Sequence, residues 1–248
     1  MNTKKAIIAS AFLALMAAGA VAHAKTLNFS GYTWEVRPSG AGKPGPNNWD
    51  PNNIWVDKKG WLHLTLTQRN GKWYSAEIYT RRSFGLGRYQ FWVSGSLDKL
   101  DKNVVFGLFS YPVVPDMGPD GTHEIDIEFA QWGNRADPIG GYTVWPTTPS
   151  VERATKGFSI TPSGNGDNAY TYRFTRRPAS TFFQSLHGYC DNDSNQFASW
   201  LYQPQNPAAH ISQEPMPAYI SLWSYKGLPP SNGQQVEMIV RAFKFTPM

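Results

Sequence analysis

The sequence predicts an all-β fold, an antiparallel sandwich or jelly roll. Helical periodicity is almost absent after residue 24, and at least ten short β-rich runs recur between turn clusters. Several runs alternate apolar and polar residues, as in Leu62–Thr67 and Val236–Arg241. A period of two is typical of a strand with one buried face, and many such strands without helices favour packed antiparallel sheets.

The expected strands cover most of the chain. In order they are Trp61–Thr67, Ser75–Thr80, Arg88–Gly95, Val104–Tyr111, Glu124–Phe129, Gly141–Trp145, Ala169–Arg177, Thr181–His187, Tyr219–Tyr225 and Gln235–Phe245. Turn-forming residues separate them. Two Pro- and Asn-rich segments, Pro38–Asn53 and Gln203–Pro217, are too long for hairpin turns, so we expect functional loops that cover the sheets.

The length of 248 residues favours a single domain, which we place at residues 25–248. Residues 1–24 have the form of a secretory signal peptide, with a basic start at Lys4 and Lys5, an apolar run to Val21 and a small-x-small cleavage sequence at 22–24. We therefore expect a secreted or periplasmic monomer that is free of the membrane once the signal is cleaved. A retained N-terminal anchor is the alternative.

Charge and metal-ligating residues exclude several classes of function. Without residues 1–24 the chain has 21 basic and 18 acidic side chains, a net charge of +3, and the basic residues are scattered. A nucleic-acid surface would show a longer basic stripe, so we expect no nucleic-acid partner. Cys190 is the single cysteine, and the histidines after the signal lack paired spacing. We expect no disulfide, no metal site and no cofactor.

Residues 123–129 concentrate acidic side chains in one expected strand. Because successive side chains of a strand point to opposite faces, Glu124, Asp126 and Glu128 share one face, while the intervening Ile and Phe residues share the other. Like charges on neighbouring positions of one face repel. A sequence that accepts this repulsion indicates a functional use for the three carboxylates.

Paired carboxylates suit glycoside hydrolysis. A retaining glycosidase needs a nucleophile and a proton donor about 5–5.5 Å apart. In an ideal strand the Cα atoms of Glu124 and Glu128 are about 13 Å apart, so the side chains must lean together. Asp126 lies between them, where it can separate their pKa values. The spacing alone leaves a calcium site and a solvated strand face as alternatives.

Several motifs resemble glycoside hydrolase family 16, the family of lichenases, laminarinases and xyloglucan transglycosylases. Residues 124–129, Glu-Ile-Asp-Ile-Glu-Phe, resemble the active-site strand of that family. The strand pair at 75–77 and 84–89, the strand at 107–111, and the later segments 170–174 and 220–223 fall in the family's order. The Glu-x-Asp-x-Glu form without an inserted residue is more similar to lichenases and transglycosylases than to laminarinases.

This resemblance implies a concanavalin-like β-jelly roll with a concave cleft and a retaining double displacement. Glu124 would be the nucleophile, Asp126 its helper and Glu128 the general acid/base. Glu77 would bind sugar hydroxyls, and Trp223 would stack on a sugar ring. Further stacking candidates near the cleft are Trp132, Trp145 and Tyr79.

Some positions depart from the family pattern. Thr122 stands where lichenases have Trp, Tyr79 where an Arg is expected, and Ala130-Gln131 where Leu-Gly usually follows the motif. Arg241 falls where the family often has a calcium-ligand Asp, and a guanidinium disfavours a cation there. These departures concern substrate recognition and leave the catalytic strand intact.

We therefore expect an endo-acting hydrolase of a β-linked polysaccharide, most directly a 1,3-1,4 or 1,3 β-glucan. A transglycosylase, or a hydrolase of another polysaccharide such as a galactan, would share the catalytic strand and differ in its sugar contacts. A non-catalytic, lectin-like sugar-binding sandwich is the alternative from another class.

Overall fold

The computed structural model describes residues 25–112, 118–162 and 168–248. Its strands are β1 Thr26–Phe29, β2 Tyr32–Val36, β3 Gly40–Gly42, β4 Asn47–Trp49, β5 Ile54–Val56, β6 Leu62–Arg69, β7 Lys72–Phe84, β8 Gly87–Ser94, β9 Val104–Ser110, β10 Ile125–Phe129, β11 Gly140–Val144, β12 Ala154–Phe158, β13 Ala169–Arg177, β14 Ser180–His187, β15 Gln196–Tyr202, β16 Met216–Ser224 and β17 Val236–Pro247. The helical elements within these ranges are one turn of α-helix, α1 Pro207–His210, and three 3-10 turns, η1 Pro51–Asn53, η2 Leu97–Lys99 and η3 Tyr225–Gly227.

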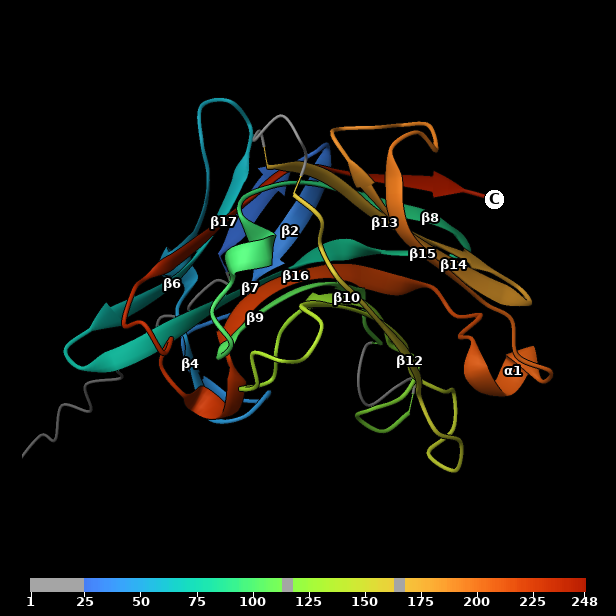
Figure 1. The fold of residues 1–248 in the computed structure, drawn as a ribbon, viewed down its shortest axis with the longest axis horizontal. Helices are drawn as coiled ribbons and strands as arrows, with labels where there is room; N and C mark the ends of the chain where they lie inside the picture. The colour runs from blue at the N-terminus through green and yellow to red at the C-terminus, as the bar shows by residue number, and fades with distance from the viewer. Residues whose placement is uncertain (1–24, 113–117, 163–167) are drawn as a thin grey trace, which may run out of the picture.

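Most of the strands form two antiparallel layers, which confirms the predicted all-β jelly roll (Figure 1). The pairing of β6 with β7 joins the two layers, and the short strands β3 and β4 lie beside β7, with β4 parallel to it. One layer runs in the order β12-β11-β10-β9-β16-β7-β2-β1 and curves over the lower face of the molecule in this view. The other layer runs β5-β6-β17-β8-β13-β14-β15. We call them the cleft sheet and the outer sheet.

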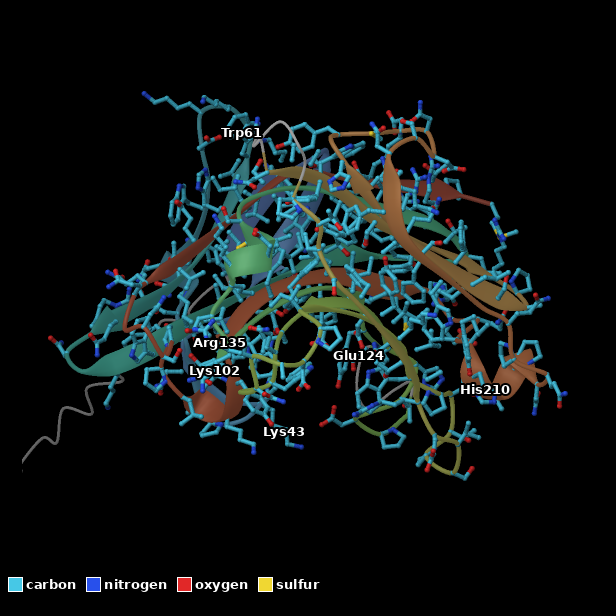
Figure 2. The ribbon with its side chains drawn as sticks, viewed as in Figure 1. Lys43, Trp61, Lys102, Glu124, Arg135 and His210 are labelled. Carbon is cyan, nitrogen blue, oxygen red and sulfur yellow. The ribbon has the colours of Figure 1, made fainter. Side chains whose placement is uncertain are left out.

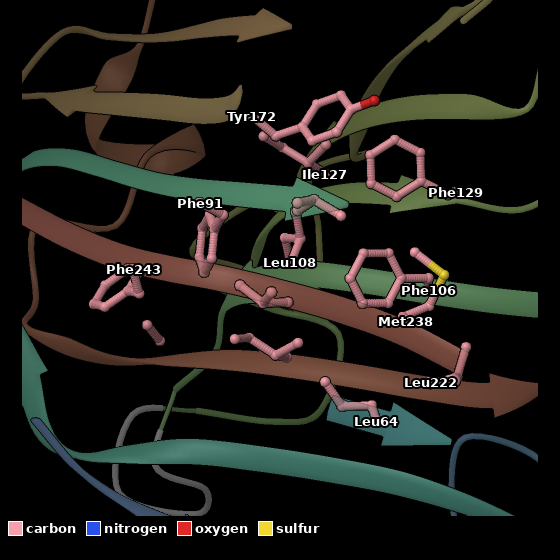
Figure 3. Packing of buried hydrophobic residues seen from close by; sticks show 14 of the residues in the cluster. Leu64, Phe91, Phe106, Leu108, Ile127, Phe129, Tyr172, Leu222, Met238 and Phe243 are labelled. Carbon is pink, nitrogen blue, oxygen red and sulfur yellow. The ribbon is translucent and has the colours of Figure 1, made fainter. Parts of the chain in front are cut away.

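The hydrophobic core fills the space between the two sheets, as the alternating pattern predicts. Ile127 and Phe129 of β10 pack beside Leu108 and Phe106 of β9, and the Phe129 ring contacts Tyr172 of β13 with centroids 4.6 Å apart (Figure 3). These side chains have lost their contact with water. Burial of a large apolar side chain contributes about 1.5–3 kcal/mol each, so the inward half of β10 anchors the strand in the cleft sheet.

All ten strands that the sequence predicts are present, with ends shifted by up to a few residues. The prediction for the two long segments was incomplete. Pro38–Asn53 contains β3, β4 and η1, and Gln203–Pro217 contains α1. The strands β3 and β4 are only three residues long, and their Gly, Asn and Pro content hides a strand pattern. The predicted signal peptide, residues 1–24, lies outside the described residues.

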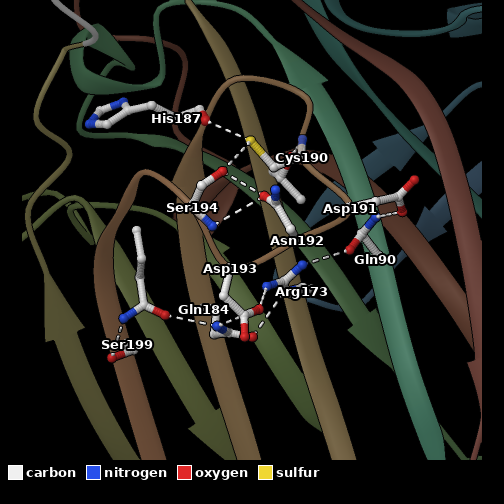
Figure 4. Close-up of polar contacts among 12 residues, drawn as sticks. Gln90, Arg173, Gln184, His187, Cys190, Asp191, Asn192, Asp193, Ser194 and Ser199 are labelled. Atoms are coloured by element: carbon white, nitrogen blue, oxygen red, sulfur yellow. Dashed lines mark hydrogen bonds and ion pairs between the residues drawn. The ribbon is translucent and has the colours of Figure 1, made fainter.

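The outer sheet carries a polar network on the face that points away from the core. Arg173 of β13 is fully buried, donates hydrogen bonds to Gln90 and Gln184, and pairs with Asp193 (Figure 4). Cys190 is a half-buried free thiol whose sulfur lies 3.2 Å from the His187 carbonyl oxygen. The loop after β14 therefore closes over this face and shields the Arg173 guanidinium from water.

Candidate active site

Strand β10 presents the three carboxylates to the cleft as the alternation requires. Asp126 and Glu128 lie in β10, and Glu124 directly precedes it. The main chain of Glu124 continues the ladder, because its carbonyl oxygen accepts a hydrogen bond from Trp145 N at 2.9 Å. His123, one residue earlier, adopts the left-handed conformation with φ 66°. The chain therefore turns at His123 and enters β10 directly after Glu124. This turn fixes the direction in which the Glu124 side chain leaves the sheet.

A cleft of about 1490 Å³ runs across the concave face of the cleft sheet. Figure 2 places Glu124 on this side of the molecule and Trp61 on the opposite side. The cleft is lined by side chains of neighbouring strands and by loops at both ends: Arg37, Lys43, Glu77, Tyr79, Phe109, Tyr111, Asp120, Glu124, Asp126, Glu128, Trp132, Thr143, Trp145, Arg153, Thr155, Tyr219, Trp223 and Tyr225. The three carboxylates thus lie together in the lining of this cleft.

Glycines flank Glu128 on both neighbouring strands. Its cross-strand partners are Gly107 of β9 and Gly141 of β11. A Cβ atom at Gly107 would lie 3.1 Å from Ser221 Oγ, whereas a Cβ at Gly141 would meet no atom within 4 Å. The floor beside Glu128 is therefore open toward β11, which leaves space for a ring next to the carboxyl group.

The carboxyl groups of the three residues are strongly coupled. Burial raises the pKa of Glu124 to about 8 despite a hydrogen bond with Asp126 that lowers it, and the charge of Glu128 adds to the rise. Burial also raises the pKa of Glu128 to about 8, with a further contribution from Asp126 and an opposing one from Arg153. The pKa of Asp126 is raised well above its ordinary value by burial and then by Glu124.

These pKa values mean that the three groups do not all ionise at neutral pH. Two carboxylates that face each other without a proton repel, so a neighbouring pair retains one. Burial raises the pKa of Glu124 and that of Glu128 to about the same value, so these pKa values alone do not assign the two roles. When the group releases one proton it holds one ionised carboxylate beside a carboxylic acid, which is the division that a nucleophile and a proton donor need.

Glu77 and Tyr79, which the sequence predicts as sugar-binding residues, line the cleft from β7. Both also have protein partners. Glu77 forms a salt bridge with Arg37 at 2.9 Å, and the Tyr79 hydroxyl donates to Glu35 at 3.2 Å. The Tyr79 ring stacks on Tyr219 with centroids 5.0 Å apart. These contacts hold the two side chains in place at the cleft wall.

The predicted stacking residues Trp132, Trp145 and Trp223 also line the cleft, but they differ in exposure. Trp132 is 40% exposed, whereas Trp223 is only 8% exposed and packs with Trp49 of β4. Trp132 and Trp223 contact each other with ring centroids 6.2 Å apart. Trp132 therefore offers the larger open ring face, with Trp223 beneath it.

Several cleft residues were missed at the sequence level, among them Arg153, Phe109, Tyr111 and Tyr219. For Phe109 and Tyr111 a signal was available, because they alternate with Leu108 and Ser110 in a strand that the sequence predicts. Arg153 precedes β12, a mostly exposed strand without alternation, so the sequence offers no comparable signal for it.

Metal-ligating clusters and membrane-spanning helices are both absent from residues 25–112, 118–162 and 168–248. No group of three His, Cys, Asp or Glu side chains converges as a metal site requires. No helix in these ranges has the length and apolar character needed to cross a membrane.

Several solved structures that resemble the chain are β-glucanases. The Bacillus licheniformis β-glucanase is 20% identical with a TM-score of 0.63, and the alignment covers 89% of this chain and 95% of that one. The chain has the fold of these β-glucanases. The glycoside hydrolase family 16 endo-glucanase of Bacteroides ovatus is 16% identical, with a TM-score of 0.60 and coverage of 87% and 94%.

The same fold also occurs in a protein described as a pseudo β-1,3-glucanase of Mycobacterium tuberculosis, which is 18% identical with a TM-score of 0.63 and coverage of 87% and 91%. No protein-family model matches the chain, and no curated protein matches it. The comparisons confirm the resemblance in fold, and the activity has to be argued from the site.

Proposed function

We propose that this protein is a retaining endo-glycoside hydrolase of a β-linked polysaccharide, most directly a β-glucan with 1,3-1,4 or 1,3 linkages. The observation that carries the proposal is the arrangement of Glu124, Asp126 and Glu128 on the floor of an open cleft, where burial and mutual repulsion keep protons in the group. Asp126 is buried, and Glu124 and Glu128 beside it are half-buried. A binding module gains nothing from crowding three carboxyl groups in this way, because their repulsion and loss of solvation cost stability.

In the proposed reaction, the ionised Glu124 attacks the anomeric carbon as the glycosidic C–O bond breaks. Glu128 gives its proton to the leaving oxygen, and a glycosyl ester on Glu124 results. Glu128, now ionised, takes a proton from a water molecule that attacks the same carbon and releases Glu124. Two inversions give a product with the original anomeric configuration.

The charge pattern of the cleft supports a neutral substrate. Two of its basic side chains are compensated, Arg37 by Glu77 and Lys43 by Asp120 at 3.2 Å. We choose a β-glucan among neutral polysaccharides because β-glucanases share the fold of this chain. Secretion or periplasmic export after removal of residues 1–24, and a monomeric state, remain part of the proposal.

Product analysis on mixed-linkage glucan, laminarin, xyloglucan and agarose tests the substrate. We expect oligosaccharides from mixed-linkage glucan or laminarin, and the first-formed anomer seen by ¹H NMR should retain the β configuration. Cleavage of agarose alone would indicate a galactan hydrolase, and longer oligosaccharides would indicate a transglycosylase. Binding without turnover would favour the lectin-like alternative, and an inverted anomer would exclude double displacement.

The variants Glu124→Gln and Glu128→Gln separate the two roles. With an aryl glycoside whose leaving group needs no proton, Glu128→Gln should still release the phenol in a rapid first phase, whereas Glu124→Gln should not. Equal behaviour of the two variants on this substrate would contradict the assignment.

A further inference from the structure

Trp145 donates hydrogen bonds to the carboxyl group of Asp126 and to the main chain of Glu124. Its indole Nε1 donates a hydrogen bond to Asp126 Oδ2 at 2.8 Å, and its main-chain N–H donates to the carbonyl oxygen of Glu124 at 2.9 Å. It follows directly after β11, whose Thr143 pairs with Asp126. The ring is therefore anchored by the same strand pairing that places the carboxylates.

The guanidinium group of Arg153 lies over the face of the Trp145 indole ring. Its guanidinium carbon lies 4.6 Å from the centroid of the Trp145 ring, within the range of a cation–π contact. Arg153 precedes Ala154, which pairs with Val144 next to Trp145. With one face covered by Arg153 and its N–H directed at Asp126, Trp145 is poorly placed as the free stacking platform that the sequence predicts.

The position of the proton in the Glu124–Asp126 pair follows from these contacts. The two carboxyl groups share a hydrogen bond, which requires a proton on one of them. Asp126 Oδ1 is buried and receives no N–H or O–H hydrogen bond from the residues that the structure describes. Asp126 Oδ2 already accepts the indole N–H, and a carbonyl-like oxygen is a better acceptor than a hydroxyl oxygen, so the proton of the Asp126 carboxyl group is favoured on Oδ1.

We propose that Trp145, held by Arg153, is a positioning residue that keeps the proton of Asp126 on Oδ1, directed at Glu124, so that Glu124 is the ionised member of the pair. A hydrogen bond to the Asp126 carbonyl-like Oδ2 also polarises the carboxyl group and makes it a better donor. The kinetic consequence rests on the proposed function, whereas the position of the proton does not.

The proton position is measured in the substrate-free protein. In a ¹H–¹⁵N spectrum of protein labelled at tryptophan, the Trp145 indole signal, assigned by its loss in Trp145→Phe, should lie downfield and shift with pH as the carboxyl pair titrates. In Asp126→Ala the signal should move upfield and stop titrating. A Trp145 signal that is the same in both proteins and independent of pH would overturn the proposal, whether or not the protein hydrolyses a polysaccharide.

The kinetic test uses Trp145→Phe, which keeps an aromatic ring and removes the N–H. We expect kcat to fall about tenfold or more, as one charge-coupled hydrogen bond implies, with less than a twofold change in KM. The acid limb of the kcat/KM profile should move to higher pH, because ionised Glu124 loses an oriented donor. Arg153→Gln should give a smaller change in the same direction.

Two comparisons make the kinetic result specific. In an Asp126→Ala background, Trp145→Phe should cause no further loss, because the coupling partner is absent. Trp61→Phe is the matched control on the opposite side of the molecule and should leave kcat and the pH profile unchanged (Figure 2). A rise in KM at constant kcat would identify Trp145 as a sugar platform and overturn the inference. Absence of turnover by the unsubstituted protein would instead contradict the proposed function.

Discussion

The two faces of β10 carry opposite kinds of side chain, apolar on the inward face and acidic on the cleft face. On the inward face, Ile125, Ile127 and Phe129 are fully buried among apolar neighbours. On the cleft face, burial acts on carboxyl groups and raises the pKa values of Glu124 and Glu128 to about 8. The side chains of the inward face therefore stabilise the fold. The carboxyl groups of the cleft face lower the stability of the fold and form the reactive site. Substitutions on the two faces should consequently change different properties.

The largest expected effect is on activity. Glu124→Gln should lower kcat about 10⁴-fold or more, which corresponds to about 5 kcal/mol of transition-state stabilisation. The same variant should unfold at a temperature equal to or above that of the parent, because it removes a group whose charged form desolvation and neighbouring carboxylates disfavour. Steady-state assays and calorimetry on one preparation make the comparison. Loss of activity together with a lower Tm would indicate that the variant is misfolded.

The inward face should respond in the opposite way. Phe129→Ala removes a fully buried ring that contacts Phe106 and Tyr172, so the free energy of unfolding should fall by about 3–5 kcal/mol. Urea denaturation measures this change. Under conditions where the variant is folded, kcat/KM should drop far less than in Glu124→Gln. A change of less than about 1 kcal/mol would show that the core does not anchor β10.

The cleft face should make stability depend on pH. The unfolded chain releases the Glu128 proton near the ordinary carboxyl pKa of 4.5, whereas the folded protein holds it to about pH 8. Between these values the folded state binds more protons, so its stability falls as pH rises. Glu128→Gln removes this loss, so its advantage in stability over the parent should be absent at pH 4 and should grow as the pH rises toward 8. A constant difference across this range would contradict the assigned shift.

Two adjacent glycines of β11, Gly140 and Gly141, also face the core and the cleft respectively, and we expect smaller effects from substituting them. A Cβ at Gly140 would lie 2.4 Å from the Phe158 ring on the core side, whereas a Cβ at Gly141 meets no atom on the cleft side. Gly140→Ala should destabilise the fold by about 1–3 kcal/mol. Gly141→Ala should change stability by less than about 0.5 kcal/mol but raise KM, because its methyl group enters the space beside Glu128. Thermal unfolding and steady-state kinetics of the two variants test this difference. Similar stabilities of the two variants would contradict the assignment of Gly140 to the core side and Gly141 to the cleft side of β11.

The alternation in residues 123–129 was sufficient to predict which side chains of β10 face the core and which face the cleft. It could not predict the surroundings of the carboxylates, because these depend on strand register. Asp126 meets Trp145 only because β10 and β11 pair in one particular register, and Arg153 reaches the indole from an edge strand without a sequence pattern. Trp223 is less exposed than expected because it packs against Trp49. Trp49 lies in strand β4, where the sequence predicts a loop.

The central claim is that Glu124 is the nucleophile, and trapping the covalent intermediate tests it most directly. A 2-deoxy-2-fluoro β-glucosyl oligosaccharide with an activated leaving group slows the second displacement more than the first when the fluorine replaces the 2-hydroxyl. Intact-mass analysis should show one added glycosyl unit, and peptide mapping should place it on Glu124. Labelling of another residue, or no labelling of a preparation that hydrolyses the parent polysaccharide, would contradict this account.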